Sequence, residues 1–263
     1  MFQNVEQSAH RCDGGDVDTT LMKGLRVLEC LVRADKPLGI SAVAAELKLQ
    51  KSNVHRTLAT LIAMRYVTQD ASGLYRPTLR IWEQGARVIA RDPVRRAALS
   101  FMQALHQESS ETVSLVVLDG AHCLWIHQIV APIPVRLTSH VGQRAPAIYP
   151  AAGKALLAYQ PDVEKRVKAI ATRYPESKRG RVKIAALLAE LATVRRTGCA
   201  YSEGDWREGV NGVASAIVGA DAVPVAALAL SGPSERMDQE RMKSLSNALL
   251  NACTHIGNAL GAS

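Results

Sequence analysis

Aromatic side chains, cysteine pairs and long apolar runs are all scarce in this chain of 263 residues. Phe, Trp and Tyr make up only 4% of it, and no apolar run approaches the roughly 18 residues that a membrane-spanning helix needs. The five cysteines are scattered and include no CxxC pair, which argues against a disulfide framework or a zinc ribbon. The first residues also lack the apolar core of a signal peptide. We therefore expect a cytoplasmic protein with reduced thiols and no membrane partner.

Aliphatic residues and positive charge, by contrast, are plentiful. Hydrophobic residues make up 48% of the chain, which at this length is enough for two domains with separate cores. The net charge is +8, and from Ile40 to Arg80 six Lys or Arg residues stand against two acids. Such a charge favours polyanionic partners but does not identify one, because a solvated surface can carry it too.

Residues 38–80 predict two short helices joined by a tight turn and followed by a β-hairpin. The second helix, residues 51–64, has apolar residues at the spacing of one helical face. They are Val54, Leu58, Leu61 and Ile62. The opposite face is cationic, has short side chains and carries no acid, so it can approach a phosphate backbone and base edges. We interpret this helix as a candidate DNA-recognition helix.

The hairpin is predicted around a four-residue turn from Asp70 to Gly73. Helices followed by such a hairpin form a winged helix-turn-helix, which we place at residues 19–78, with Arg76 and Arg80 near the wing. The predicted contacts to a double-stranded DNA operator are Lys51, Ser52, Asn53, His55, Arg56 and Arg76. The alternatives are a solvated polar helix face and a winged helix used for protein contacts.

Three more segments complete the domain organisation. Residues 1–18 are polar and predict a disordered tail, and residues 79–91 predict a linker helix. The linker's apolar stripe is expected to be buried within the chain, to pack also against a second subunit, or both; it consists of Leu79, Trp82, Ala86 and Ile89. In the first helix the expected buried stripe is Leu21, Leu25, Leu28 and Val32. Asp92-Pro93 predicts a helix start, where we place the boundary to a second domain at residues 92–263.

The second domain alternates between strand and helix patterns. Strands are expected at residues 112–118, 123–130, 137–141, 199–202, 212–218 and 224–231. Helices are expected at residues 94–108, 151–159, 163–170 and 182–196 and near the C-terminus. Strands flanked by helices at both ends predict an α/β domain with an antiparallel sheet, and an α+β class for the whole chain.

Three stretches together resemble the IclR family of bacterial transcriptional regulators. They are KSNVHRTL at residues 51–58, AAGKALLA at residues 151–158, and the closing strands with Gly198-Cys199-Ala200, Glu208-Gly209-Val210 and residues 226–233. They follow the family's order over about Thr20 to Gly261. The resemblance implies a repressor or activator that is a dimer or tetramer. It also implies a winged helix-turn-helix, a linker helix and a GAF-like α/β domain that binds a small carboxylate or aromatic acid as effector.

The AAGK stretch is physically suited to an acid. Ala151, Ala152 and Gly153 stand at a predicted helix start, where free amides and the helix dipole favour an anion, although small residues there also suit tight packing. The resemblance adds Ser202, Gly212, Ala229 and Ser231 to the predicted pocket. Trp125 and Trp206 are further candidates, each either a ligand contact or a scaffold residue.

This chain departs from the pattern of regulators that sense small oxoacids. Gly212 stands where a cysteine is frequent, Ser202 where an acid occurs and Ala229 where a serine occurs. Ala216 stands where a proline is common. These changes make the predicted pocket roomier and more apolar, which favours a larger effector such as an aromatic acid. In the recognition helix, Asn53 replaces the family's usual threonine or serine, so no base preference can be transferred.

Enzyme and metal sites have weak support in the sequence. There is no GxSxG elbow and no GxxxxGK[ST] loop around Lys154, and the acids Glu203, Asp205 and Glu208 fit a solvated loop or a helix cap. His122 and His127 point to opposite faces of a predicted strand. We therefore expect no catalytic residue, no metal and no cofactor. The alternative from another class is a small-molecule hydrolase or isomerase built on the α/β domain.

Overall fold

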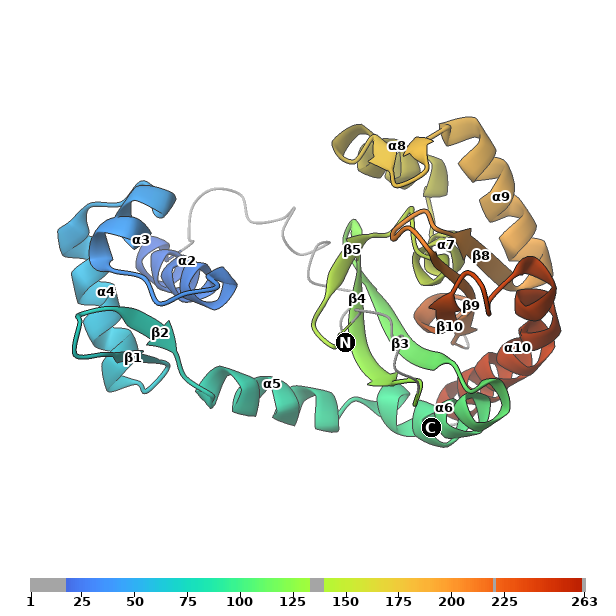
Figure 1. The fold of residues 1–263 in the computed structure, drawn as a ribbon, viewed down its shortest axis with the longest axis horizontal. Coiled ribbons are helices and arrows are strands. Elements are labelled where there is room, and N and C mark those ends of the chain that lie inside the picture. The colour runs from blue at the N-terminus through green and yellow to red at the C-terminus, as the bar shows by residue number, and fades with distance from the viewer. Residues whose placement is uncertain (1–17, 133–139, 220, 262–263) are drawn as a thin grey trace. The chain divides into compact units, whose positions relative to one another are not determined.

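The computed structural model describes residues 18–132, 140–219 and 221–261, and the chain divides between Arg91 and Asp92 into two compact units (Figure 1). The tail predicted for residues 1–18 lies outside the described residues except for Asp18, as does most of the strand predicted at residues 137–141. No helix in the described part of the chain is long and apolar enough to cross a membrane.

The first unit contains the predicted helices and hairpin. Its elements are α2 (Thr19–Arg33), α3 (Ile40–Leu47), α4 (Lys51–Ala63), β1 (Val67–Gln69), β2 (Tyr75–Pro77) and α5 (Arg80–Ala90). Helices α2, α3 and α4 contact one another, and the two strands pair antiparallel. Their shared core includes Val27, Val43, Val54 and Leu58, none of which is exposed. This is a winged helix-turn-helix, as predicted.

The predicted buried stripe of α2 is wrong for three of its four residues. Leu21, Leu25 and Val32 are 61%, 53% and 50% exposed, whereas Leu28 is partly buried against the core. The buried residues of α2 are Val27, Cys30 and Leu31. Both sets have helical spacing, so α2 is apolar on two faces and periodicity alone cannot say which face the core covers. The other face of α2 is left at the surface.

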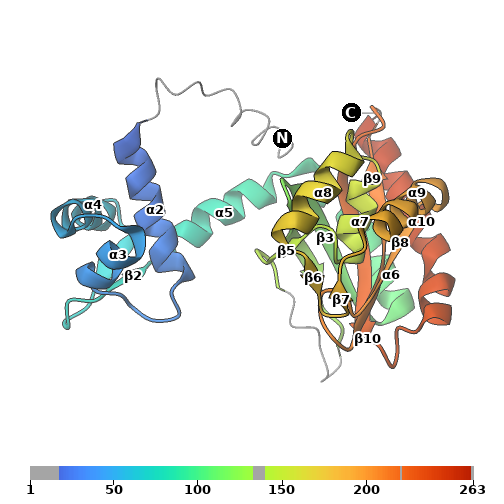
Figure 2. The ribbon, with the colours of Figure 1, turned by 90° about the horizontal axis from the view of Figure 1, so that it is seen from above.

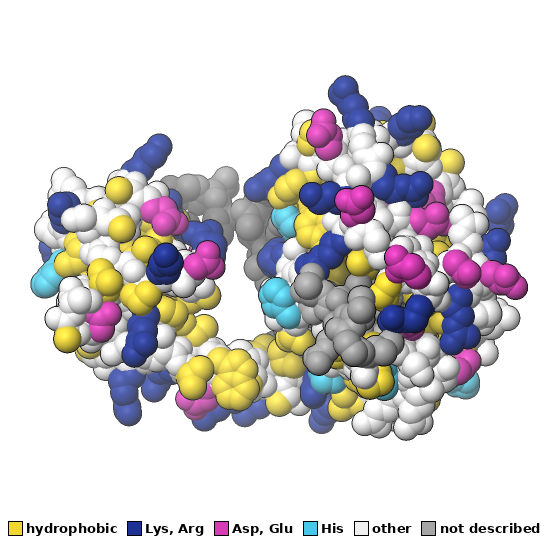
Figure 3. Space-filling model, in the orientation of Figure 1, with side chains coloured by type: hydrophobic (Ala, Val, Ile, Leu, Met, Phe, Trp, Pro, Cys, Tyr) yellow, Lys and Arg dark blue, Asp and Glu magenta, His cyan; other side chains and the backbone are white. Residues whose placement is uncertain are grey.

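Helix α5 has no buried residue among its members. Leu79, just before it, is 80% exposed and Trp82 is 71% exposed. The prediction that this stripe is buried within the chain is therefore wrong. Figure 3 shows hydrophobic side chains at the surface of α5.

The second unit is built on a six-stranded antiparallel sheet with the order β5-β4-β3-β10-β9-β8. Its strands are β3 (Thr112–Asp119), β4 (His122–Ile129), β5 (Arg144–Pro146), β8 (Cys199–Glu203), β9 (Val210–Val218) and β10 (Pro224–Pro233). Its helices are α6 (Pro93–Ser109), α7 (Ala151–Leu157), α8 (Val163–Arg173), α9 (Ile184–Thr197) and α10 (Gln239–Gly261). A small hairpin, β6 (Glu176–Ser177) and β7 (Gly180–Arg181), follows α8. The predicted α+β class is confirmed.

Helices cover the sheet in two groups (Figure 2). Helices α6 and α10 pack against each other and the sheet, while α7 packs on β8, β9 and β10 and against α9. The strand residues beneath α7 are small; they are Ala200, Ala214, Ala216, Ala227 and Ala229. Short side chains let α7 approach the sheet closely, whereas Leu228 and Leu230 alternate with these alanines along β10 and are fully buried.

The second unit begins where the sequence predicts a helix start. Asp92 Oδ1 accepts a hydrogen bond from the Arg95 amide at 2.7 Å, and Pro93 occupies the first helical position of α6. Helix α9 ends where the sequence predicts it, at Gly198. This residue takes a left-handed conformation with φ of 79° and ends the helix before β8.

Candidate DNA-recognition helix and ligand pocket

Helix α4 is anchored by its apolar face. Val54 and Leu58 are fully buried, whereas Lys51, Ser52, His55 and Arg56 are exposed and Asn53 is half-buried. Ile62, predicted for the buried face, is 36% exposed because it lies in the last turn, beyond the closest packing on the core. The predicted DNA contacts on α4 thus share one accessible surface.

The N-terminus of α4 has its own affinity for anions. The Gln50 carbonyl accepts the amides of Asn53 and Val54 at 3.0 and 3.1 Å, and no side chain caps the helix. The first-turn amides and the positive end of the helix dipole therefore suit a phosphate group. Since α4 carries no acid, nothing on the helix itself opposes a polyanion.

The wing is a short hairpin with a rigid turn. The Asp70 carboxylate accepts hydrogen bonds from the Ser72 hydroxyl at 2.6 Å and from the amides of Ser72 and Leu74 at 2.9 and 3.0 Å. These hydrogen bonds lower the pKa of Asp70, and the bond from the Ser72 hydroxyl has the largest effect. Arg76 pairs with Thr68 in the hairpin and is exposed. Arg80 begins α5, and its guanidinium lies 5.3 Å from the centroid of the Tyr66 ring. Tyr66 directly precedes β1, so Arg80 is near the wing, as expected.

One cavity in the second unit collects the predicted effector-binding residues, and we call it the α7 pocket. It is lined by Trp125, Pro150, Ala151, Ala152, Ser202, Trp206, Arg207, Val210, Asn211, Gly212, Ala229, Leu230 and Ser231. Every predicted pocket residue except Gly153 is among them. Sheet register explains part of this, because Ser202, Gly212 and Ser231 stand side by side on β8, β9 and β10.

Gly153 does not line the α7 pocket. Its amide already donates to the Pro150 carbonyl at 2.9 Å, and a methyl group at this position would collide with the Ala147 carbonyl. Glycine is therefore needed here for close packing, the alternative left open by the sequence. Within the described residues, the first-turn amides of Ala151 and Ala152 have no recorded hydrogen-bond partner.

The chemistry of the α7 pocket is apolar with several hydrogen-bond donors. Among the described residues that line it there is no Asp or Glu, and Arg207 is the charged one. Burial lowers the pKa of Arg207 from its ordinary value, although a guanidinium remains protonated at neutral pH. The remaining polar side chains are those of Ser202, Asn211, Ser231 and Trp206. Such a pocket excludes cationic ligands and suits an anion with an apolar body.

Lys154 fixes the loop that forms one wall of the α7 pocket, residues 203–209. Its ammonium group lies 3.0 Å from Asp205 Oδ2, 3.0 Å from Glu190 Oε1 and 3.1 Å from the Tyr201 carbonyl, and the residue is only 5% exposed. Asp205 is therefore an ion-pair partner of Lys154. This corrects the expectation that Asp205, as part of the acidic cluster, belongs to a solvated loop. Lys154 links α7, α9 and the 203–209 loop.

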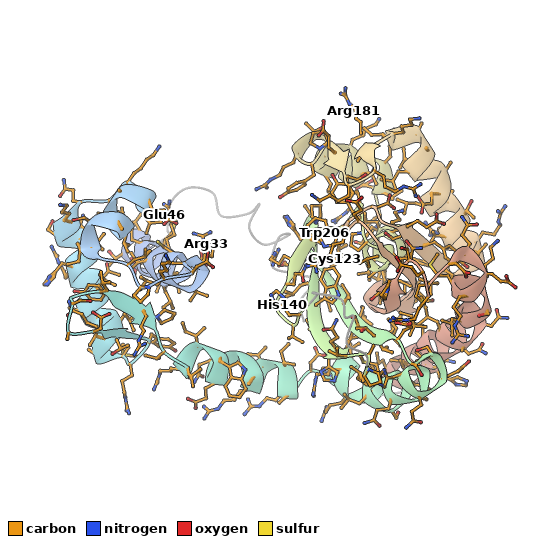
Figure 4. The ribbon with its side chains drawn as sticks, in the orientation of Figure 1. Arg33, Glu46, Cys123, His140, Arg181 and Trp206 are labelled. Atoms are coloured by element: carbon orange, nitrogen blue, oxygen red, sulfur yellow. The ribbon has the colours of Figure 1, made fainter. Side chains whose placement is uncertain are left out.

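Trp206 is the aromatic part of the same loop. Its ring stacks on Tyr149 with centroids 6.2 Å apart and an interplanar angle of 13°, and the Tyr149 hydroxyl lies 2.6 and 2.7 Å from the carbonyls of Tyr174 and Glu176. Trp206, which is labelled in Figure 4, packs against the hydrophobic cluster that includes Cys123. The indole Nε1 is buried and has no hydrogen-bond partner within the part of the chain that the structure describes.

Sequence reasoning missed part of the pocket wall. The missed residues are Pro150, Arg207, Val210, Asn211 and Leu230. Arg207 directly follows Trp206 in the connection between two predicted strands, which was the available cue for it. In the described ranges, no cluster of three or more His, Cys, Asp and Glu side chains has the spacing of a metal site.

Comparisons with known proteins agree with both units. A family model for the IclR helix-turn-helix domain matches residues 20–71, and a model for the bacterial transcriptional regulator IclR C-terminal domain matches residues 86–258. The HTH-type transcriptional regulator KdgR of Escherichia coli (strain K12) is 29% identical over 248 residues, covering 94% of each chain. The HTH-type transcriptional repressor AllR of the same strain is 29% identical over 92% of this chain and 90% of that protein.

Solved structures share the same architecture. A putative transcriptional regulator from Rhodococcus sp. RHA1 has a TM-score of 0.78 at 26% identity, over 92% of this chain and 98% of that one. An IclR homolog from Microbacterium hydrocarbonoxydans, crystallised with 4-hydroxybenzoate, has a TM-score of 0.76 at 22% identity, over 93% of this chain and 100% of that one. Because the C-terminal family model alone matches more than half of the sequence, the chain belongs to the IclR family of bacterial transcriptional regulators.

Proposed function

We propose that this regulator binds an operator through α4 and the wing, and that a small organic acid in the α7 pocket modulates this binding in the cytoplasm. The acid lies against the free amides of Ala151 and Ala152 at the start of α7. Lys51, Ser52, Asn53, His55 and Arg56 contact the DNA from α4, and Arg76 contacts it from the wing. Lys51 and Arg76 neutralise phosphates, while Ser52, Asn53 and Arg56 are placed for base edges.

The observation that carries the effector part is the composition of the α7 pocket. Its walls are mostly apolar, it has donors from side chains and free amides, and none of the described residues that line it is an acid. Two tryptophans and several small residues leave room for an aromatic ring, which supports an aromatic acid over a two-carbon oxoacid. The 4-hydroxybenzoate complex of the Microbacterium hydrocarbonoxydans protein is consistent with this choice. The likeness of the present chain to that protein supports a shared fold and not a shared ligand.

The active form is a homodimer or a tetramer made of two such dimers. Leu79 and Trp82 on the linker are 80% and 71% exposed, and Leu21 on α2 is 61% exposed. Exposed apolar stripes on two helices are costly in a monomer and suit burial against a second copy. Two subunits present two α4 helices to successive major-groove turns of a pseudo-palindrome.

Effector control requires that the acid bind two arrangements of the dimer with different affinity. The linker helix α5 is the element that connects the ligand-binding unit to the DNA-binding unit, so it transmits the difference. Operator affinity and acid affinity are then coupled reciprocally.

The experiment is a gel-shift titration of the purified full-length protein on the intergenic DNA upstream of its own gene. We expect a specific complex whose dissociation constant changes when an aromatic acid is added. Tighter binding of glyoxylate-sized acids than of aromatic acids would contradict the effector class. Turnover of the acid without DNA binding would favour an enzyme instead.

A further inference from the structure

Positive charge in the second unit is concentrated in one stretch, which belongs to neither the α7 pocket nor the DNA-recognition helix. Residues 162–183, which contain α8 and the β6–β7 hairpin, include eight Lys or Arg residues and three acids. Their net charge of +5 is more than half of the net charge of +8 carried by the whole chain. Figure 3 shows Lys and Arg side chains at the surface over this part of the second unit.

Few of these cations are neutralised within the chain. Lys168 pairs with Glu164 at 2.6 Å, and the guanidinium of Arg179 lies 3.7 Å from the carboxylate of Glu203. Five other cations of the stretch are exposed and form no ion pair with a described residue, and we call them the basic surface. They are Lys165, Arg173, Lys178, Arg181 and Lys183. Like charges gathered in one region repel one another, so this region favours an anionic partner.

Lys183 stands at a position where the chain itself disfavours a cation. It is the N-cap residue of α9, and the first turn of this helix contains no acid. The positive end of a helix dipole lies at its N-terminus, where acids are stabilising and cations are not. An anion supplied from outside the chain would offset both the helix dipole and the lysine.

The β6–β7 hairpin holds its cations on a fixed backbone. The Lys178 amide donates to the Asp205 carbonyl at 3.0 Å, and the Ser177 hydroxyl accepts the Arg179 amide at 3.1 Å. The Arg181 side chain, labelled in Figure 4, extends away from the second unit. Since these hydrogen bonds already order the hairpin, a polyanion can bind it without first ordering the backbone.

Duplex DNA is the polyanion that fits this surface best. The chain belongs to a family of DNA-binding regulators, and the DNA that carries an operator continues on both sides of it. A duplex presents a closely spaced, regular row of phosphates along its whole length. Lys and Arg side chains contact phosphates whatever the base sequence, and such contacts add affinity without specificity.

We propose that the basic surface binds the phosphate backbone of the DNA that flanks the operator. This second contact strengthens operator binding and leaves unchanged the sequence that α4 reads. The assignment rests on the proposed operator binding and adds to it a DNA contact made by the second unit.

The test compares the full-length protein on two duplexes, one limited to the operator footprint and one extended on each side by about two helical turns of unrelated sequence. We expect wild-type protein to bind the longer duplex at least about tenfold more tightly, measured by fluorescence anisotropy. The triple variant Lys165→Gln/Lys178→Gln/Arg181→Gln should bind both duplexes alike, with wild-type affinity for the shorter one. Each phosphate contact steepens the plot of log K against log salt by about 0.9, so this variant should lose about 2–3 in slope on the longer duplex alone.

A second triple variant is the matched control. Arg195→Gln/Arg196→Gln/Lys243→Gln removes the same charge from exposed positions on α9 and α10 and should behave as wild type on both duplexes. Circular dichroism shows whether each variant is folded. Isothermal titration calorimetry with benzoate, the probe for an aromatic acid, should give wild-type affinity in both variants because neither changes the α7 pocket.

Wild-type protein that binds both duplexes equally would overturn the assignment, in favour of a solvated face or an acidic protein partner, while operator binding would stand. The same loss of affinity in both triple variants would also overturn it, because net charge and not this surface would then be responsible. If wild-type protein binds no upstream DNA at all, the proposed operator binding fails and this assignment fails with it.

Discussion

Replacing Lys154 with methionine removes the ammonium group that joins α7, α9 and the 203–209 loop while keeping a flexible chain of similar length. The ammonium makes three contacts of 3.0 to 3.1 Å, to two carboxylates and one carbonyl. A hydrogen bond to a charged group contributes about 1.5–3 kcal/mol, and a buried acceptor left unpaired costs about as much again.

Solvent reduces this loss at two of the three partners. The side chains of Glu190 and Asp205 are 38% and 23% exposed, so water can replace part of what each loses. Methionine also restores some apolar packing. We therefore expect Lys154→Met to lower the free energy of unfolding by about 2–3 kcal/mol. For a unit of this size, the midpoint of thermal unfolding should fall by about 4–12 °C.

The assay is differential scanning calorimetry of the full-length protein, with Lys165→Met on the exposed face of α8 as the matched control. Because the 203–209 loop loses its anchor, benzoate affinity should fall in the same variant. An unchanged unfolding midpoint in Lys154→Met would show that these contacts do not stabilise the unit. Lost stability with unchanged benzoate affinity would show that Lys154 does not position the pocket wall.

Three other perturbations test separate parts of the account. Arg56→Ala should weaken operator binding at least about tenfold, measured by fluorescence anisotropy, while benzoate affinity stays at the wild-type value. Lys23→Ala on α2 is the control. An unchanged DNA footprint of Arg56→Ala would refute the assignment. Gly212→Cys places a side chain in the pocket, with its Cβ 3.0 Å from the Leu230 carbonyl, and should lower benzoate affinity while smaller acids still bind. Burial raises the pKa of the thiols of Cys30 and Cys253 to about 11 and about 12, so iodoacetamide at pH 8 should label them only after unfolding. Because folding raises the pKa of both thiols, their contribution to the free energy of unfolding is complete below pH 9 and declines as the pH rises toward 11. Rapid labelling of the native protein would contradict both expectations.

Most of the fold could be predicted from periodicity and punctuation. Helix α4, the wing turn at Asp70 and the start of α6 at Asp92-Pro93 each have a local physical signal that tertiary contacts do not override. Helix α2 shows the limit, because two of its faces are apolar and the choice between them depends on α3 and α4. For α5, the apolar stripe was recognised, but whether it is buried depends on partners that the local sequence does not specify.

The pocket was predictable where sheet register determines it. Ser202, Gly212 and Ser231 meet because adjacent strands pair at those residues. Gly153 was assigned to the ligand because small residues at a helix start serve both anion binding and close packing, and only the position of the Ala147 carbonyl separates the two. Arg207 was missed because it belongs to a loop, where no periodicity indicates which way a side chain points.

The central claim is that an acid bound in the second unit changes DNA affinity in the first. The most direct measurement is the dissociation constant of the wild-type protein for fluorescent upstream DNA, determined by anisotropy at increasing benzoate concentrations. The account predicts a saturable change of at least about fivefold. An unchanged dissociation constant at benzoate concentrations that calorimetry shows to be saturating would contradict it.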